Sequence, residues 1–161
     1  MIEKKKNLSE YYRPIEFSPD QAQNTEIGIV VSEWNGHITD SLLNGAIDCL
    51  TGHGIPAENI LVKYVPGSFE LPLGAKWLLE RTRVEAVICI GCIIQGETRH
   101  FDFIAQAVAD GIRDVGLQFS KPVIFSVLTC NNMIQAEDRA GGKHGNKGVE
   151  GAISALKMLT F

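Results

Sequence analysis

One apolar run in the middle of the chain constrains the fold more than any other feature. Residues 84–94 are almost continuously apolar, and they lead into a polar segment that contains Gly96, Glu97, Thr98 and His100. A short apolar run without alternation is typical of a strand that is covered on both faces of its sheet. Such strands are usually parallel, and their ligands bind at the carboxyl ends. The run therefore predicts a parallel sheet with a functional site at residues 95–102.

Three more segments repeat the order of strand and then helix. Apolar strands are expected at residues 27–31, 60–65 and 122–128, and apolar residues at helical spacing follow each strand. Two helices, separated near residues 141–148, are expected after the last strand. Four strands that alternate with helices predict an α/β fold with a four-stranded parallel sheet and helices on both faces. This is a three-layer sandwich of the flavodoxin-like type.

Length and charge limit the remaining possibilities. A chain of 161 residues is long enough for one domain with a substantial core. We expect residues 25–161 to form that domain and residues 1–24, which are polar and contain prolines, to be an N-terminal tail. The net charge of −4 gives no general attraction to nucleic acid, and no apolar segment approaches the roughly twenty residues that cross a bilayer. The start of the chain lacks the apolar core of a signal peptide, so a cytoplasmic location is expected.

The cysteines and histidines do not predict a redox or metal site. Cys89 and Cys92 have the C-x-x-C spacing, but within a strand residues three apart point to opposite faces, which favours two small buried hydrophobes. The four histidines show no ligand spacing. We therefore expect no metal; that no cofactor is needed is implied only by the family resemblance described below.

The first two strands end in residues that allow two interpretations. Trp34 could be an ordinary partly buried aromatic or a platform on which a flat heterocycle stacks. Ser68 and Glu70 could cap and stabilise a helix start, or they could bind the hydroxyl groups of a polyhydroxy chain. Both alternatives remain open from the residues alone.

The third and fourth strands are followed by groups that suit an anion. Residues 96–98 can present successive backbone N–H groups to a phosphate, and His100 is either a capping or core histidine or a proton carrier. Residues 138–148 are rich in glycine and carry Arg139, Lys143 and Lys147, but the P-loop pattern is absent. These basic groups are either solvated helix residues or phosphate ligands.

Four segments together resemble the 6,7-dimethyl-8-ribityllumazine synthase family. They are Trp34 with Asn35, residues 65–72, residues 91–103 and residues 139–148, and they occur in the family order. The resemblance runs from about residue 27 to the C-terminus. It implies a transferase of riboflavin biosynthesis that condenses 5-amino-6-(D-ribitylamino)uracil with 3,4-dihydroxy-2-butanone 4-phosphate and releases phosphate and water.

The resemblance also implies a role for each residue of the site. Trp34, with Asn35, stands where the family stacks an aromatic, most often Phe, on the pyrimidine, and His100 carries protons. The resemblance implies that Ser68, Phe69 and Glu70 bind the ribityl chain and ring edge, and that Cys92, Ile93 and Ile94 line the pocket. Glu97, Thr98 and Arg139 would bind the phosphate. Phe125 would close the pocket, and Lys147 would lie near the ring. In the family, Phe125, Arg139 and Lys147 would come from the neighbouring subunit.

Assembly and partners follow from the same resemblance. The family forms pentamers that associate into decamers or hollow shells of sixty subunits, and the absence of an insertion at residues 141–148 resembles the shell-forming members. Residues 14–17 could then add a strand to a neighbour's sheet. Riboflavin synthase is a further partner that the resemblance implies. Two rivals remain, a flavodoxin-like module that binds a flavin or nucleotide and a shell protein without activity.

Overall fold

The computed structural model contains one four-stranded parallel sheet at its centre, and it describes Ser9 and residues 13–161. The strands are β1 (Ile27–Ser32), β2 (Ile60–Val65), β3 (Ala86–Ile94) and β4 (Val123–Cys130), and their order in the sheet is β2-β1-β3-β4. The predicted sheet is confirmed. From β1 the chain continues to β2 on one side of the sheet, and from β3 it continues to β4 on the other side, so the strand order reverses between β1 and β3. In α/β sheets, ligands bind at the carboxyl ends of the strands at such a point.

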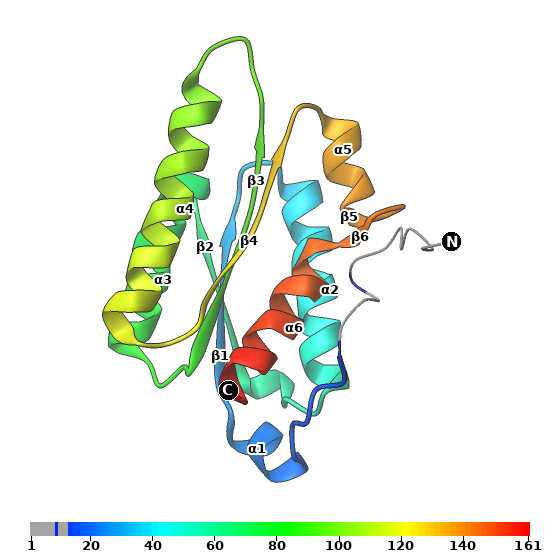
Figure 1. Ribbon diagram of the computed structural model, residues 1–161, viewed down its shortest axis with the longest axis vertical. Helices are drawn as coiled ribbons and strands as arrows, with labels where there is room; N and C mark the ends of the chain where they lie inside the picture. The colour runs from blue at the N-terminus through cyan, green and yellow to red at the C-terminus, as the bar shows by residue number, and fades with distance from the viewer. Residues whose placement is uncertain (1–8, 10–12) are drawn as a thin grey trace.

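Helices cover both faces of this sheet (Figure 1). On one face lie α3 (Leu71–Arg81) and α4 (His100–Phe119), and on the other lie α2 (Gly36–Gly52) and α6 (Lys147–Leu159). Successive strand residues alternate between the two layers, so that Ile29 and Val31 pack toward α2 and α6 whereas Val30 packs toward α3 and α4. Cys89 and Cys92 are divided between the two cores in the same way, as predicted. The three-layer sandwich is thus confirmed.

The connection between β4 and α6 holds more structure than the sequence indicated. It consists of α5 (Met133–Asp138) and a small antiparallel hairpin of β5 (Ala140–Gly142) and β6 (Gly145–Asn146). The two helices are separated at the predicted place, and the hairpin is what separates them. Gly141 and Gly145 have φ values of 109° and 83°, which favour glycine.

The helices α2 and α6 approach each other closely at Gly148. A Cβ atom at this position would collide with the Leu42 carbonyl oxygen. Only glycine lets the first turn of α6 lie against α2 at this distance.

The segment before β1 is more ordered than a tail would be. Ser18 caps α1 (Pro19–Asn24) by accepting a hydrogen bond from the Gln21 N–H at 3.1 Å, and the Gln21 side chain returns a bond to the Ser18 N–H. Residues 13–18 have no regular secondary structure, and Ile15 and Phe17 pack against the core beside α2. Residues 1–8 and 10–12, the rest of the predicted tail, lie outside the described residues.

Two short 3-10 helices complete the described chain, η2 (Ala57–Asn59) before β2 and η3 (Ser68–Glu70) after it. Of the helices in the part of the chain that the structure describes, none combines the length and apolar character that crossing a membrane requires.

Candidate active site

A cavity of about 520 Å³ opens at the carboxyl ends of β1, β2 and β3, where the sequence predicts the site. This volume is in the range of pockets that bind small molecules. Most of the predicted site residues line it, namely Trp34, Asn35, Ser68, Phe69, Cys92, Ile93, Ile94, Thr98 and His100. Three strand ends that lie far apart in the sequence therefore converge on one cavity.

Trp34 stands at the rim of the cavity on a fixed backbone. The Glu33 N–H donates to the Val65 carbonyl at 2.9 Å, and the Trp34 N–H donates to the Pro66 carbonyl at 3.2 Å. The Trp34 residue itself is 73% exposed within one chain. An exposed indole beside a cavity matches a stacking platform better than it matches a partly buried core aromatic.

Asn35 connects the first strand end to the third. Its Nδ2 donates to the Cys92 carbonyl at 2.9 Å, and its backbone is left-handed with φ 59° and ψ 45°. Asparagine is among the few residues besides glycine that adopt this conformation readily. The side chain therefore fixes the loop before α2 onto the end of β3.

The turn after β2 shows which of its residues caps the helical start. Glu70 accepts the Gly67 N–H through Oε2 at 3.0 Å, so the carboxylate stabilises the first turn. Ser68 is only 7% exposed and lies against Gly91, where a Cβ atom would come within 2.5 Å of the Ser68 Oγ. The cap is therefore Glu70 and not Ser68, and Gly91 is required for the turn to reach β3.

His100 begins α4 directly beyond the end of β3. Its N–H donates to the Thr98 Oγ1 at 3.4 Å, and both residues are exposed and line the cavity. Because His100 is exposed, it is not a core histidine. Its position at the start of a 20-residue helix places the cavity near the positive end of the helix dipole.

Cys92 lies in the cavity wall without being reactive. The residue is 1% exposed, and burial, together with the neighbouring Cys130, raises the pKa of its thiol to about 12. The protonated thiol at neutral pH is an apolar wall group. Among the described residues, no three His, Cys, Asp or Glu side chains lie together as a metal would require.

Some predicted residues do not line the cavity of a single chain. They are Glu70, Glu97, Phe125, Arg139 and Lys147. Phe125 instead lines a second hollow of about 650 Å³ near the amino end of β4.

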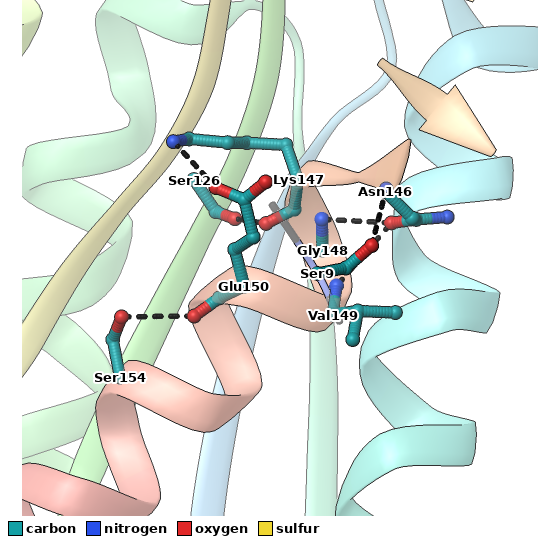
Figure 2. Close-up of polar contacts among 8 residues, drawn as sticks. All are labelled: Ser9, Ser126, Asn146, Lys147, Gly148, Val149, Glu150 and Ser154. Atoms are coloured by element: carbon teal, nitrogen blue, oxygen red, sulfur yellow. Dashed lines mark hydrogen bonds and ion pairs between the residues drawn. The ribbon is translucent and has the colours of Figure 1, made fainter. Parts of the chain in front are cut away.

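Arg139 and Lys147 nevertheless belong to one local structure beside β4, which we call the β4–α6 cluster and define as Phe125, Ser126, Arg139, Lys147 and Glu150. The Phe125 side chain itself packs against the core on the α3–α4 face of the sheet. Ser126, next to Phe125, donates its hydroxyl to the Lys147 carbonyl at 2.5 Å, and the Lys147 N–H donates to the Arg139 carbonyl at 2.9 Å. Figure 2 shows Ser126, Lys147 and Glu150 at the start of α6. Of the residues that are missing from the cavity, Arg139 and Lys147 are therefore held together at the start of α6, whereas Glu70 and Glu97 are not part of this cluster.

Sequence reasoning missed several lining residues. Phe101 and Ile104 face the cavity from the first turns of α4, and Met133 faces it from the start of α5. The three-residue spacing of Phe101 and Ile104 after His100 was a usable signal, because residues three apart share a helix face. Met133 had no such signal.

The comparisons with known proteins agree with this geometry. The family model described as 6,7-dimethyl-8-ribityllumazine synthase matches residues 24–161. A protein of that name from Cytophaga hutchinsonii is 60% identical over 96% of this chain and 94% of its own length. A protein of the same name from Porphyromonas gingivalis is 52% identical over 94% of this chain and 92% of its own length. Another from Flavobacterium johnsoniae is 53% identical over 98% of this chain and 82% of its own length. The chain belongs to the 6,7-dimethyl-8-ribityllumazine synthase family.

Proposed function

We propose that this protein condenses 5-amino-6-(D-ribitylamino)uracil with 3,4-dihydroxy-2-butanone 4-phosphate to 6,7-dimethyl-8-ribityllumazine, with release of phosphate and water, in riboflavin biosynthesis. The observation that carries the proposal is the convergence of Trp34, Ser68 and His100 on one cavity in a chain of this family. These side chains supply a stacking surface, a hydroxyl group and a titratable imidazole, which are the groups that the two substrates require.

The first substrate would occupy the inner part of the cavity. Its flat pyrimidine would stack on Trp34, while its ribityl hydroxyls would meet Ser68, Phe69 and Glu70 at the turn after β2. Glu70 uses Oε2 for the Gly67 N–H, and a carboxylate has a second oxygen that can accept a hydroxyl hydrogen. The capping and binding interpretations of Glu70 are therefore compatible. The wall residues Cys92, Ile93 and Ile94 would contact the ring edge.

The phosphate of the second substrate would lie near the start of α4. Glu97 and Thr98 belong to the turn that leads into this helix, where backbone N–H groups and the helix dipole favour an anion. Arg139 of a neighbouring subunit would supply a positive charge to the phosphate. His100 would then lie between the two substrates.

The reaction moves protons at every step. An amine attacks the ketone, water leaves to give an imine, phosphate is eliminated, and the second nitrogen attacks the remaining carbonyl and closes the ring with loss of a second water. A well-placed histidine contributes about 10²–10⁴-fold to such steps, whereas positioning two reactants can contribute roughly 7–11 kcal/mol. Positioning by the cavity would therefore dominate over proton transfer by His100.

We infer that the site is shared between subunits of a pentamer, because the β4–α6 cluster does not reach the cavity of its own chain. Phe125, Arg139 and Lys147 would close the cavity of the next subunit. Further assembly of pentamers into a sixty-subunit shell, and association with riboflavin synthase in the cytoplasm, extend this proposal. Sedimentation in native buffer should give a particle much larger than a pentamer; pentamers alone would contradict the shell.

The chain would be organised as a single domain of residues 25–161 with an N-terminal segment that adds a strand to a neighbour. Within one chain Ile15 and Phe17 pack against their own core. Strand addition would therefore require this segment to exchange its packing partner.

The decisive experiment mixes both substrates with the purified protein and follows the lumazine absorbance. We expect turnover that needs neither metal nor cofactor, including in the presence of a chelator. A protein that bound flavin tightly without forming lumazine would instead support the flavodoxin-like rival, and a folded shell without turnover would support the structural one.

A further inference from the structure

Glu150 forms the most shielded ion pair of the described chain. Its Oε2 lies 2.9 Å from the Lys147 Nζ, and the side chains of Lys147 and Glu150 are 38% and 19% exposed. Every other acidic partner in a described ion pair is more exposed, for example Glu80 at 41% and Asp102 at 58%. Shielding from water strengthens an ion pair, so this contact restricts the lysine more than a surface pair would.

The backbone of Lys147 is fixed as well (Figure 2). Its carbonyl accepts the Ser126 hydroxyl, and its N–H donates to the Arg139 carbonyl. The preceding residue, Asn146, caps α6 by accepting the Gly148 and Val149 N–H groups at 2.8 and 3.3 Å. The main chain of Lys147 is thus held by Ser126 and Arg139, and its ammonium is held by Glu150.

A lysine that is held at both ends differs from an ordinary surface lysine. Its four-carbon stem is flexible, and its ammonium carries three N–H donors. One donor points to Glu150, which leaves two for an acceptor outside the chain. Those donors would suit a carbonyl oxygen of a pyrimidine.

We propose that Glu150 is a positioning residue that aims the Lys147 ammonium at the ribitylaminouracil ring bound in the neighbouring subunit. This inference rests on the proposed function, in which Lys147 reaches the next site. Glu150 itself does not touch the substrate. Its carboxylate selects one orientation of the lysine before the substrate arrives, so that less side-chain freedom is lost on binding.

A simpler explanation must be separated from this one. Glu150 lies in the first turn of α6, where any carboxylate stabilises a helix through the dipole. A residue with only that role would affect folding and would act independently of Lys147. A positioning residue would act only while Lys147 is present.

The test is a double-mutant cycle on the full-length assembled protein with the variants Glu150→Gln, Lys147→Met and the pair. We expect Glu150→Gln to raise the KM for ribitylaminouracil about fivefold, a typical size for a coupled contact, and to leave the KM for the butanone phosphate unchanged. In the Lys147→Met background the same change should have no further effect. Calorimetric binding of ribitylaminouracil should show the same pattern.

Several outcomes would overturn the inference. One is an equal rise in the KM for ribitylaminouracil when Glu150→Gln is made with Lys147 present and with Lys147→Met. The others are a fall in kcat with neither KM changed, and a wild-type KM for ribitylaminouracil in Lys147→Met. If Glu150→Gln does not assemble, Glu150→Asp, which keeps the helix-end charge but shortens the reach, replaces it in the same cycle. A wild-type protein that forms no lumazine and binds no ribitylaminouracil would overturn the proposed function and this inference together, whereas an active wild type with an additive cycle would overturn only this inference.

The matched control is Glu80→Gln, which makes the same chemical change in the Lys76–Glu80 pair of α3. This pair lies away from both the cavity and the β4–α6 cluster. The kinetic constants of Glu80→Gln should equal those of the wild type. An effect as large as that of Glu150→Gln would show that the loss is not specific to the Lys147–Glu150 pair.

Discussion

The cavity and the β4–α6 cluster contain residues that were predicted for one site, yet one chain keeps them apart. The cavity gathers the ends of β1, β2 and β3 around an exposed indole and an imidazole. The cluster connects Lys147 to Ser126 through the Ser126 hydroxyl and to Arg139 through a main-chain bond, and Phe125 precedes Ser126 on β4. The first region is a cavity with no Lys or Arg among its lining residues, whereas the second contains two cations, Arg139 and Lys147. This separation is what the proposed sharing of one site between two copies of the chain would require.

The largest expected effect comes from mixing two impaired proteins and assaying them at substrate concentrations below the wild-type KM values. Trp34→Ala with His100→Ala disables the cavity, and Arg139→Ala with Lys147→Met disables the cluster. Subunits of the two variants, unfolded together and reassembled at equal ratio, should regain about one quarter of the wild-type activity, because in a head-to-tail ring that fraction of sites combines an intact cavity with an intact cluster. Steady-state lumazine formation measures the recovery.

The control for this mixture is each double variant reassembled by itself, which should be far less active than the mixture at substrate concentrations below the wild-type KM values. A mixture that is no more active than its components, although sedimentation shows mixed oligomers, would mean that one chain builds its whole site.

The second prediction separates the two regions kinetically. His100→Ala should lower kcat by about 10²–10³-fold and leave measurable turnover, since general acid–base catalysis contributes about 10²–10⁴-fold. Arg139→Ala should mainly raise the KM for the butanone phosphate by about tenfold or more, because it removes a charge-assisted contact to phosphate. Initial rates at varied concentrations of each substrate decide it. Complete inactivity of a folded His100→Ala protein, or an unchanged phosphate-substrate KM for Arg139→Ala, would refute this division.

A third prediction compares Gly91, which lies on β3 against the Ser68 turn (the floor), with Gly96, which lines the cavity (the lip). At Gly91 a Cβ atom would lie 2.5 Å from the Ser68 Oγ and 3.0 Å from the Leu71 Cδ1, whereas at Gly96 it would meet nothing within 4 Å. Gly91→Ala should therefore lower the free energy of unfolding by about 1–3 kcal/mol through overpacking. Gly96→Ala is the control, with an expected change of at most about 0.5 kcal/mol. Chemical denaturation measures both, and equal effects would show that the floor yields as easily as the lip.

The smallest expected effect is at Cys92. Since burial raises the pKa of this thiol to about 12, the reactive thiolate is scarce at pH 8 and increases as the pH rises toward 12. Iodoacetamide should leave Cys92 unmodified in the native protein at pH 8, as mass spectrometry of its peptides can show. The denatured protein, in which the thiol regains an ordinary pKa, serves as the control; rapid native modification would mean that the cavity wall opens.

The linked effect on stability has a definite sign. A thiol whose pKa is higher in the folded state stabilises the fold below its unfolded pKa of about 8.5, and this contribution is lost as the pH rises through the interval up to 12.

The sequence predicted the sheet and its helices because their signals are local. Residues 60–65 were expected as a strand and form β2, and the apolar spacing that ends at Gly52 matches the end of α2. The strand order was not predicted, since no periodicity states which strands are neighbours. The β5–β6 hairpin was missed because its strands of three and two residues are too short to show alternation.

Other misses had signals that could have been used. Ser18 and Gln21 form a capping box, a spacing that marks a helix start, yet residues 1–24 were expected to be a tail. Ser68 was considered as a cap where Glu70 provides it. The separation of Phe125, Arg139 and Lys147 from the cavity of their own chain was implied by the family resemblance, whereas local sequence patterns alone do not encode it.

The backbone around Trp34 has a consequence for the thermodynamics of ligand capture. Main-chain bonds to Val65 and Pro66 immobilise the loop that carries the indole, and the Asn35 amide anchors the same loop to the end of β3. The aromatic surface is therefore preorganised when the protein folds, and a heterocycle that stacks on it need not order the loop. We expect association with the ring to carry a small entropic penalty from the protein, so that removing the anchor in Asn35→Gly would weaken binding chiefly through entropy while the indole remains in place.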